Sequence, residues 1–190
     1  TLTPSASANT VDYSGAAQTV KTPTTRNYYH LVLSGSGTDV LSSVTGTAGD
    51  FTMSGTVTTT NVATFTAVGG NLNVGSGTTL HLAGFALTVT GTTIVGGTLD
   101  TATSATGTKA FNGAVTVSSG GAFTMSAMNP VVTFGAGITQ SSATLMNIGT
   151  NAANTLVGDL AGSGAGGITW GGAMAVSSGT TTNNYSGTTT

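Results

Sequence analysis

The clearest strand pattern in the chain is Leu72-Asn73-Val74-Gly75-Ser76-Gly77-Thr78-Thr79-Leu80-His81-Leu82. Apolar and polar residues alternate on both sides of a Gly-rich break, and such alternation predicts two short strands, each with one buried face. The pattern returns 43 residues later (115 − 72) as Val115-Thr116-Val117-Ser118-Ser119-Gly120-Gly121-Ala122-Phe123-Thr124-Met125. A unit of strand, break and strand that recurs along a chain is typical of repeat proteins, whose units stack on one another.

The same alternation extends over most of the chain. It recurs in Leu31-x-Leu33, Phe51-x-Met53, Leu87-x-Val89, Val132-x-Phe134 and Met174-x-Val176. The 42 Thr residues favour strands, and the sequence contains no Glu, which removes one good helix former. Because the strand units return about every 20–25 residues, we predict an all-β fold, a parallel β-helix (β-solenoid) with coils of that length.

In a parallel β-helix, a single coil cannot bury its own apolar side chains, so burial comes from stacking coils about 4.8 Å apart. Gly at the corners supplies backbone conformations that other residues avoid. The alternative is a pair of tandem β-sandwich domains, with strands about every 8–12 residues. Sandwiches usually have longer strands and more charge on their outer faces, whereas this chain is only 4% charged. We therefore favour the parallel β-helix.

Composition restricts the partners of the chain. Its net charge is −2 and its three basic residues are scattered, so no electrostatic attraction to nucleic acid or to an anionic membrane is expected. There is no Cys, and hence no disulfide or thiolate metal site. No apolar run approaches the roughly 18 residues of a membrane helix, so we expect no membrane insertion within this segment. Residues 1–4 do not resemble a signal peptide, which places any secretion signal outside the segment.

One short phrase repeats at long range. Tyr13-Ser14-Gly15 returns as Tyr185-Ser186-Gly187, an offset of 172 residues (185 − 13), and the second copy begins near Met174. We therefore interpret residues 1–190 as a single repetitive solenoid segment of a longer tandem array or filament. The expected partners are adjacent repeats or copies of the chain itself, docked end to end in a head-to-tail contact of the kind that yields filaments.

Two longer phrases carry a resemblance to a known family. They are Tyr13-Ser14-Gly15-Ala16-Ala17-Gln18-Thr19-Val20 and Tyr28-Tyr29-His30-Leu31-Val32-Leu33-Ser34-Gly35-Ser36-Gly37-Thr38. With them, the chain resembles the repeat modules of very large secreted bacterial surface proteins, the "beta strand repeat" adhesins. The resemblance implies an extracellular or cell-surface location and a structural or adhesive role. It brings no catalytic residues with it.

The densest cluster of reactive side chains contains Lys21, Arg26, Tyr28, Tyr29 and His30. Aromatic rings beside a base could stack on a sugar or contact another chain. Arg26, Tyr28 and His30 are therefore candidate surface-contact residues, and surface polysaccharide is a candidate partner. In the competing interpretation, Tyr29, Leu31 and Leu33 point inward and the remaining residues decorate one strand.

Thr-x-Thr pairs suggest a second use of the surface. If outward pairs stacked on successive coils, their hydroxyls and methyls would form a flat array suited to binding ice. The steps between pairs are unequal, however, and outward Thr is favoured on strands in any case. The pairs are Thr22/Thr24, Thr45/Thr47, Thr64/Thr66, Thr88/Thr90 and Thr106/Thr108.

The sequence offers little from which to build a catalytic or metal site. The five Asp are isolated, and His30 and His81 are 51 positions apart with no acidic cluster near either. We predict no catalytic residues, no metal ligands and no cofactor. The hypothesis is a non-enzymatic extracellular module, a stiff structural or adhesive rod of a bacterial surface or filament protein. The alternatives are an ice-binding β-solenoid and a carbohydrate-binding module.

Overall fold

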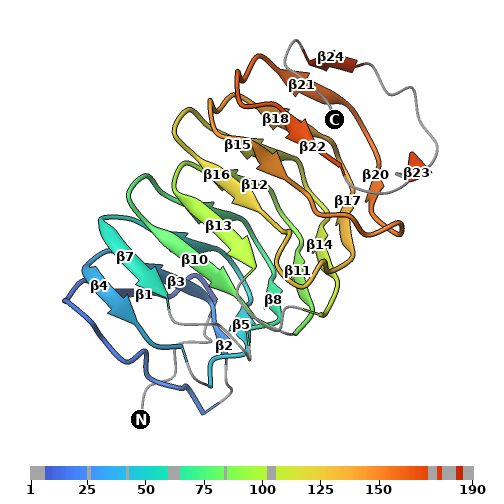
Figure 1. Ribbon diagram of the computed structural model, residues 1–190. Helices are drawn as coiled ribbons and strands as arrows, with labels where there is room; N and C mark the ends of the chain where they lie inside the picture. Colours follow the sequence, from blue (N-terminus) through green and yellow to red (C-terminus); the bar gives the residue numbers. More distant parts are fainter. Residues whose placement is uncertain are drawn as a thin grey trace.

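The computed structural model describes residues 7–24, 27–41, 43–59, 65–83, 85–101, 106–170, 175–176 and 183–185. Within these ranges the chain forms 24 strands and no helix, and the strands make three parallel sheets that wind into a β-solenoid (Figure 1). The prediction of an all-β parallel β-helix is confirmed. The alternative of tandem β-sandwiches is wrong, because the sheets of a sandwich are antiparallel.

The described strands are divided among the sheets as follows. Sheet 1 has nine strands, β1 (Thr10–Tyr13), β3 (His30–Leu33), β6 (Phe51–Met53), β9 (Leu72–Val74), β12 (Thr93–Val95), β15 (Val115–Val117), β18 (Ile138–Gln140), β21 (Leu160–Gly162) and β24 (Asn183–Tyr185). Sheet 2 has seven, β4 (Ser36–Asp39), β7 (Thr56–Thr59), β10 (Thr79–Leu82), β13 (Thr98–Thr101), β16 (Ala122–Thr124), β19 (Met146–Asn147) and β22 (Ile168–Thr169). Sheet 3 has eight, β2 (Asn27–Tyr28), β5 (Gly46–Thr47), β8 (Ala67–Val68), β11 (Leu87–Val89), β14 (Lys109–Phe111), β17 (Val132–Phe134), β20 (Thr155–Leu156) and β23 (Ala175–Val176).

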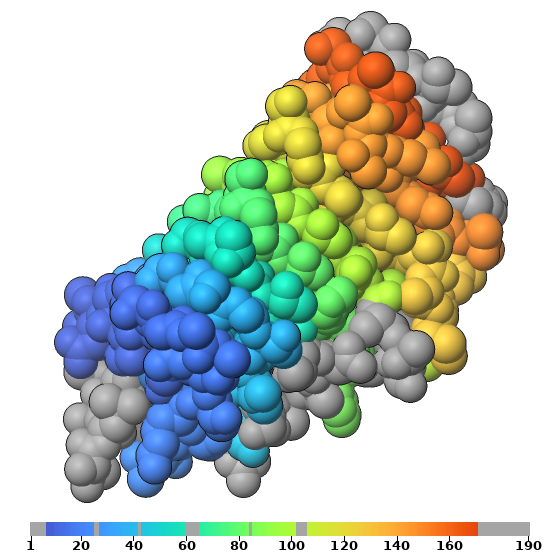
Figure 2. Space-filling view, turned by 60° about the vertical axis from the view of Figure 1, so that its left-hand side comes forward, coloured from blue at the N-terminus to red at the C-terminus, as the bar shows by residue number. Residues whose placement is uncertain are grey.

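Each full coil passes through sheets 1, 2 and 3 in turn and then returns to sheet 1 one strand further along. Facing residues along sheet 1 are 20 to 23 positions apart; for example, Leu31 faces Phe51 and Val115 faces Ile138. The coil length therefore agrees with the predicted period. Because successive coils lie beside one another, the sequence colours form bands across an elongated body (Figure 2).

The Tyr-Ser-Gly phrase returns at the same place in the solenoid. Tyr13 ends β1 and faces Leu33, and Tyr185 ends β24 and faces Gly162 in the same column of sheet 1. Eight steps separate β1 from β24 in that sheet, so the 172-residue offset corresponds to 21.5 residues per coil (172/8). The long-range repeat is thus in phase with the coils.

The core follows the predicted alternation. Val74, Val117 and Phe123 are fully buried, as expected for inward residues on strands of sheets 1 and 2. Aromatic rings add specific contacts: Phe111 stacks on Phe134 with ring centres 5.7 Å apart, and Phe123 lies 5.5 Å from Phe111. Such pairs contribute about 0.5–1.5 kcal/mol each beyond the burial of their area. The inward columns therefore bind neighbouring coils to one another.

The corner between sheet 3 and sheet 1 is the most regular part of the solenoid. From β5 to β21, each connection at this corner has three residues, as in 48–50, 69–71 and 90–92. Connections between sheet 2 and sheet 3 have four to seven residues, as in 83–86 and 125–131. Differences in coil length are therefore taken up at the other two corners.

Polar side chains form a ladder along this regular corner. The backbone N–H of Asp50 donates to His30 Nδ1 (2.9 Å), and that of Asn71 donates to Asp50 Oδ1 (2.7 Å). The backbone N–H of Thr92 continues the series to Asn71 Oδ1 (2.9 Å). We call His30, Asp50, Asn71 and Thr92 the corner ladder. Each of its hydrogen bonds joins one coil to the next and satisfies a backbone donor at the turn.

Small residues make room for the corner ladder. Gly49, Gly70 and Gly91 each precede one of its members. A Cβ atom on Gly70 would lie 2.4 Å from Asp50 Oδ1, and one on Gly91 would lie 2.5 Å from Asn71 Oδ1. Both distances are well inside van der Waals contact. A larger residue at either position would therefore displace the ladder side chain of the preceding coil.

Candidate functional site

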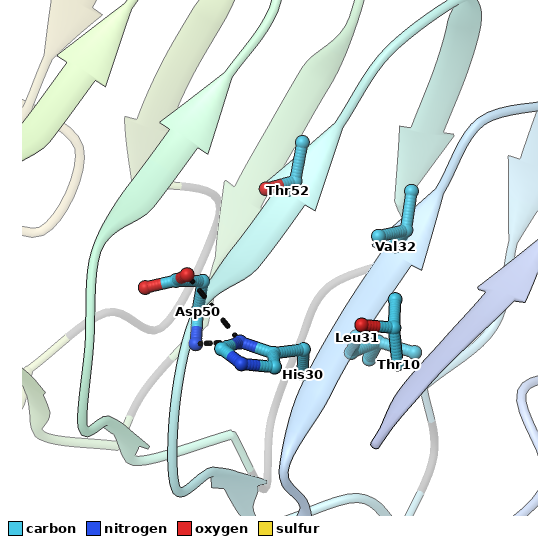
Figure 3. Close-up of a pocket in the computed structure, with 6 residues that line it drawn as sticks. All are labelled: Thr10, His30, Leu31, Val32, Asp50 and Thr52. Atoms are coloured by element: carbon cyan, nitrogen blue, oxygen red, sulfur yellow. Dashed lines mark hydrogen bonds and ion pairs between the residues drawn. The ribbon is translucent and has the colours of Figure 1, made fainter. Parts of the chain in front are cut away.

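A shallow depression with a volume of about 190 Å³ lies on the outer face of sheet 1, over β1, β3 and β6 (Figure 3). Leu31 is fully buried, and Val32 offers an apolar side chain. The polar side chains of the depression come from the other four residues. The residues that line it, which together we call the His30 depression, are Thr10, His30, Leu31, Val32, Asp50 and Thr52.

The imidazole of His30 is held in place by two contacts. Its Nδ1 accepts the backbone N–H of Asp50, and the ring of Tyr29 meets it edge-on, with centres 4.7 Å apart. Because Nδ1 is an acceptor, the neutral ring carries its hydrogen on Nε2. Asp50 Oδ2 lies 3.3 Å from Nδ1, which in the neutral ring is a contact between two acceptors and becomes an ion pair when the ring is protonated.

The carboxylate of Asp50 is bonded at one oxygen only. Oδ1 accepts the backbone N–H of Asn71 at 2.7 Å, which fixes the side chain at the corner. Oδ2 accepts no hydrogen bond from the other described residues, and the side chain is 41% exposed. The depression therefore offers one anionic acceptor, one N–H donor and the two hydroxyls of Thr10 and Thr52.

The prediction of a surface role for Tyr28 is wrong. Tyr28 is fully buried in sheet 3, where its hydroxyl lies 3.0 Å from that of Tyr13 and donates to the carbonyl of Lys21. Burial, and then the Tyr13 hydroxyl, raise the pKa of Tyr28 well above its ordinary value. The chain bends at Tyr29 between β2 and β3, so residues 28–33 do not share one alternation, and Tyr29 is half-buried rather than inward. Arg26 lies outside the described residues.

Residues 13–20, the first of the two phrases that resemble the adhesin repeats, have an internal structural role. Gln18 Oε1 accepts the backbone N–H of Gly15 (2.7 Å), and the backbone N–H of Gln18 donates to Asp39 Oδ1 (2.7 Å). Asp39 is fully buried on β4 of the next coil. The Tyr13 hydroxyl accepts the backbone N–H of Lys21 at 2.8 Å. The phrase therefore folds the first coil onto the second.

The Thr-x-Thr pairs do not form one face, so the predicted ice-binding surface is wrong in its residues. Thr47 is buried, and Thr88 is flanked on sheet 3 by Ala67 and Ala110 rather than by Thr. Thr64 lies outside the described residues. The other members are scattered over strands and loops, with Thr22 and Thr45 half-buried and Thr24, Thr66, Thr88, Thr90, Thr106 and Thr108 exposed.

The structure contains a Thr column that the sequence analysis missed. Four outward Thr residues face one another on successive strands of sheet 2. The sequence signal for this column is a Thr directly before an inward residue of sheet 2, as in Thr79-Leu80 and Thr98-Leu99. The column is one side chain wide, because His81 and Asp100 lie in the next outward column. Its members are Thr38, Thr58, Thr79 and Thr98.

Each His lies beside an Asp of the following coil, which the sequence analysis did not anticipate. His81 Nδ1 lies 2.6 Å from Asp100 Oδ1 on the outer face of sheet 2, and His30 lies beside Asp50 on sheet 1. The separations of 19 and 20 residues equal one coil, which is the signal in the sequence. Among the described residues, no group of three or more His, Cys, Asp or Glu side chains could hold a metal ion.

Lys109 is a buried cation in the core. Its side chain is fully buried on β14 between Leu87 and Val132, and Nζ donates to the carbonyls of Ala83 (3.0 Å) and Phe85. Burial disfavours the ammonium and lowers the pKa of Lys109 to about 8. Lys109 therefore makes folding sensitive to pH in the alkaline range.

Raising the pH from 8 to 10 is expected to increase the free energy of unfolding by about 1–2 kcal/mol. In this window Lys109 keeps its proton in the unfolded chain, with an ordinary pKa of 10.5, but loses it in the folded protein. The unfolded state then binds more protons, so stability rises with pH. Above pH 10 the raised pKa of Tyr28 acts in the opposite direction, because the unfolded tyrosine alone ionises. Urea unfolding at several pH values measures the effect.

The matched variant for this measurement is Lys109→Met, which keeps a long unbranched side chain and removes the charge. Its stability should be independent of pH between 8 and 10. A wild-type protein with a flat profile in that range would contradict the assignment. So would a variant that retains the rise.

Comparison with known proteins gives no match, whether the chain is set against family models, curated proteins or solved structures. Among the described residues, no helix is long and apolar enough to cross a membrane.

Proposed function

We propose that the chain is a non-enzymatic structural segment of a stiff extracellular rod at a cell surface. The observation that supports this proposal is the continuity of three parallel sheets through the described coils, with fully buried inward columns such as Leu33, Met53 and Val74. Backbone hydrogen bonds in all three sheets join each coil to the next. A chain with only 4% charged residues suits a spacer more than a reaction centre.

The proposal includes a tandem arrangement of repeats. It is supported by Tyr13 and Tyr185, which occupy the same column of sheet 1 eight coils apart. A following repeat that keeps this phase would extend the same three sheets. The partner at each end of the segment is then an adjacent repeat of one polypeptide, or a second copy of the chain docked end to end.

Labelling of intact cells tests the location and the shape together. Antibodies raised against the chain are expected to label unpermeabilised cells that produce it, along thin projections visible by electron microscopy. Protease treatment of the intact cells should remove the labelled projections. Labelling that requires permeabilisation would contradict the proposal, and so would a signal confined to compact particles.

A further inference from the structure

The His30 depression combines groups that recognise one class of ligand. Asp50 Oδ2 is an acceptor, His30 Nε2 carries a donor hydrogen in the neutral ring, and the hydroxyls of Thr10 and Thr52 can donate or accept. Val32 supplies an apolar surface beside them (Figure 3). We propose that this depression binds one ring of an uncharged sugar. The inference goes beyond the proposed structural role and does not depend on it.

The charges of the depression exclude other small ligands. It contains no Lys or Arg, so a phosphate, sulfate or carboxylate group would meet the Asp50 carboxylate without a compensating cation. Its single carboxylate is too little for Ca²⁺, which takes six to eight oxygen ligands. A ring that carries hydroxyls on its edge and C–H groups on its face satisfies both the polar residues and Val32.

Asp50 and His30 are positioned before any ligand arrives. The backbone N–H of Asn71 holds the Asp50 carboxylate, and the backbone N–H of Asp50 holds the imidazole. The ring of Tyr29 also contacts the imidazole, edge-on. Fixed side chains lose little freedom on binding, which is why preorganised groups recognise small ligands better than mobile ones. In this interpretation the corner ladder sets the geometry of the sugar site.

The polar contacts assign a role to each group. Asp50 Oδ2 accepts a ring hydroxyl, because an ionised acceptor makes the strongest of the available hydrogen bonds. His30 Nε2–H donates to a ring or hydroxyl oxygen, and Thr10 and Thr52 select the position of the ring across β1 and β6. Asp50 is therefore the residue whose charge should matter most to affinity.

Nuclear magnetic resonance on the ¹⁵N-labelled chain tests the proposal. Maltotriose and N,N′,N″-triacetylchitotriose, both uncharged, are titrated to about 50 mM, since a single small site of this kind is expected to bind in the millimolar range. The backbone amide signals of Asp50 and Asn71 report directly on the site, because these N–H groups donate to His30 and Asp50. Saturable shifts of these signals with at least one sugar are expected, and no shift with either would overturn the proposal.

Variants separate the site from general surface effects. Asp50→Asn keeps an oxygen for the Asn71 amide and removes the charge, so binding should weaken about fivefold while the fold is retained. Asp100→Asn, at the other His–Asp pair, is the control and should bind as the wild type does. Unchanged affinity in Asp50→Asn would overturn the proposal. Glucose 6-phosphate binding as tightly as the neutral sugars would do the same. Neither result would test the proposed structural role of the chain.

Discussion

Replacing Val117 with aspartate is expected to lower the free energy of unfolding by about 3–5 kcal/mol. Val117 is fully buried on β15, between Val95 and Gln140 in an inward column of sheet 1. Gln140 Nε2 already donates to the backbone carbonyls of Thr144 and Gly167, so it has no free N–H for a new carboxylate. Urea unfolding followed by far-ultraviolet circular dichroism measures the loss.

The control is Thr116→Asp, one position away on the same strand. Thr116 is half-buried on the outer face, level with Ile94 and Thr139. A carboxylate at that position reaches water, so its effect should stay within about 0.5 kcal/mol. Similar losses in the two variants would mean that β15 does not have one buried and one exposed face.

The second large effect is expected at the regular corner. Gly91→Ala should destabilise the protein by about 2–4 kcal/mol, which adds the cost of overpacking to that of a lost hydrogen bond. The new Cβ would lie 2.5 Å from Asn71 Oδ1 and 2.6 Å from the carbonyl oxygen of Gly70. The coil must shift or the hydrogen bond from the Thr92 amide to Asn71 must break. Thermal and urea unfolding both report the loss.

Gly120→Ala provides the comparison for this variant. Gly120 has a φ of +83° at the corner between sheets 1 and 2, and a Cβ there would meet nothing within 4 Å. Its replacement should cost about 1 kcal/mol through backbone strain alone. If Gly120→Ala proves the more damaging of the two, close packing is not what limits the residue at position 91.

The architecture could be predicted from the sequence because it follows from local patterns. The alternation around Val74 and Val117 identifies inward residues, and its return after whole coils identifies the stacking. The first signal acts over a few residues and the second over whole coils, and the core requires only apolar side chains of roughly suitable size. The coil length follows from the same repeats.

The wrong predictions for Tyr28 and for the Thr pairs arose where the chain turns. Tyr28 and Leu31 are both inward, although their spacing of three breaks a period of two, because the bend at Tyr29 moves the chain from sheet 3 to sheet 1. Alternation cannot be counted through such a corner. The prediction that the Thr-x-Thr pairs form one face was wrong for the same reason, since Thr88 and Thr47 belong to different columns of sheet 3.

The His30 depression could not be predicted from composition, because its residues come from three successive strands. Thr10, His30 and Asp50 follow one another at intervals of about one coil. Whether they come to lie side by side depends on the pairing register of successive strands, which changes with the lengths of the corners. The His–Asp separations of 19 and 20 residues carry the information, but only once the coil length is known. Gly49, placed directly before Asp50, is the local sign of the corner.

The contrast between one constant corner and two variable ones has an evolutionary consequence. Residues 69–71 form one of the constant three-residue corners, and an insertion among them would break the hydrogen bond from Asn71 to Asp50. An insertion within 125–131 would leave the facing pairs of all three sheets unchanged. Mutation can therefore lengthen and diversify the loops between sheets 2 and 3, while selection keeps the length of the corner between sheets 3 and 1 constant. Related segments could present different loops to their surroundings on an identical frame.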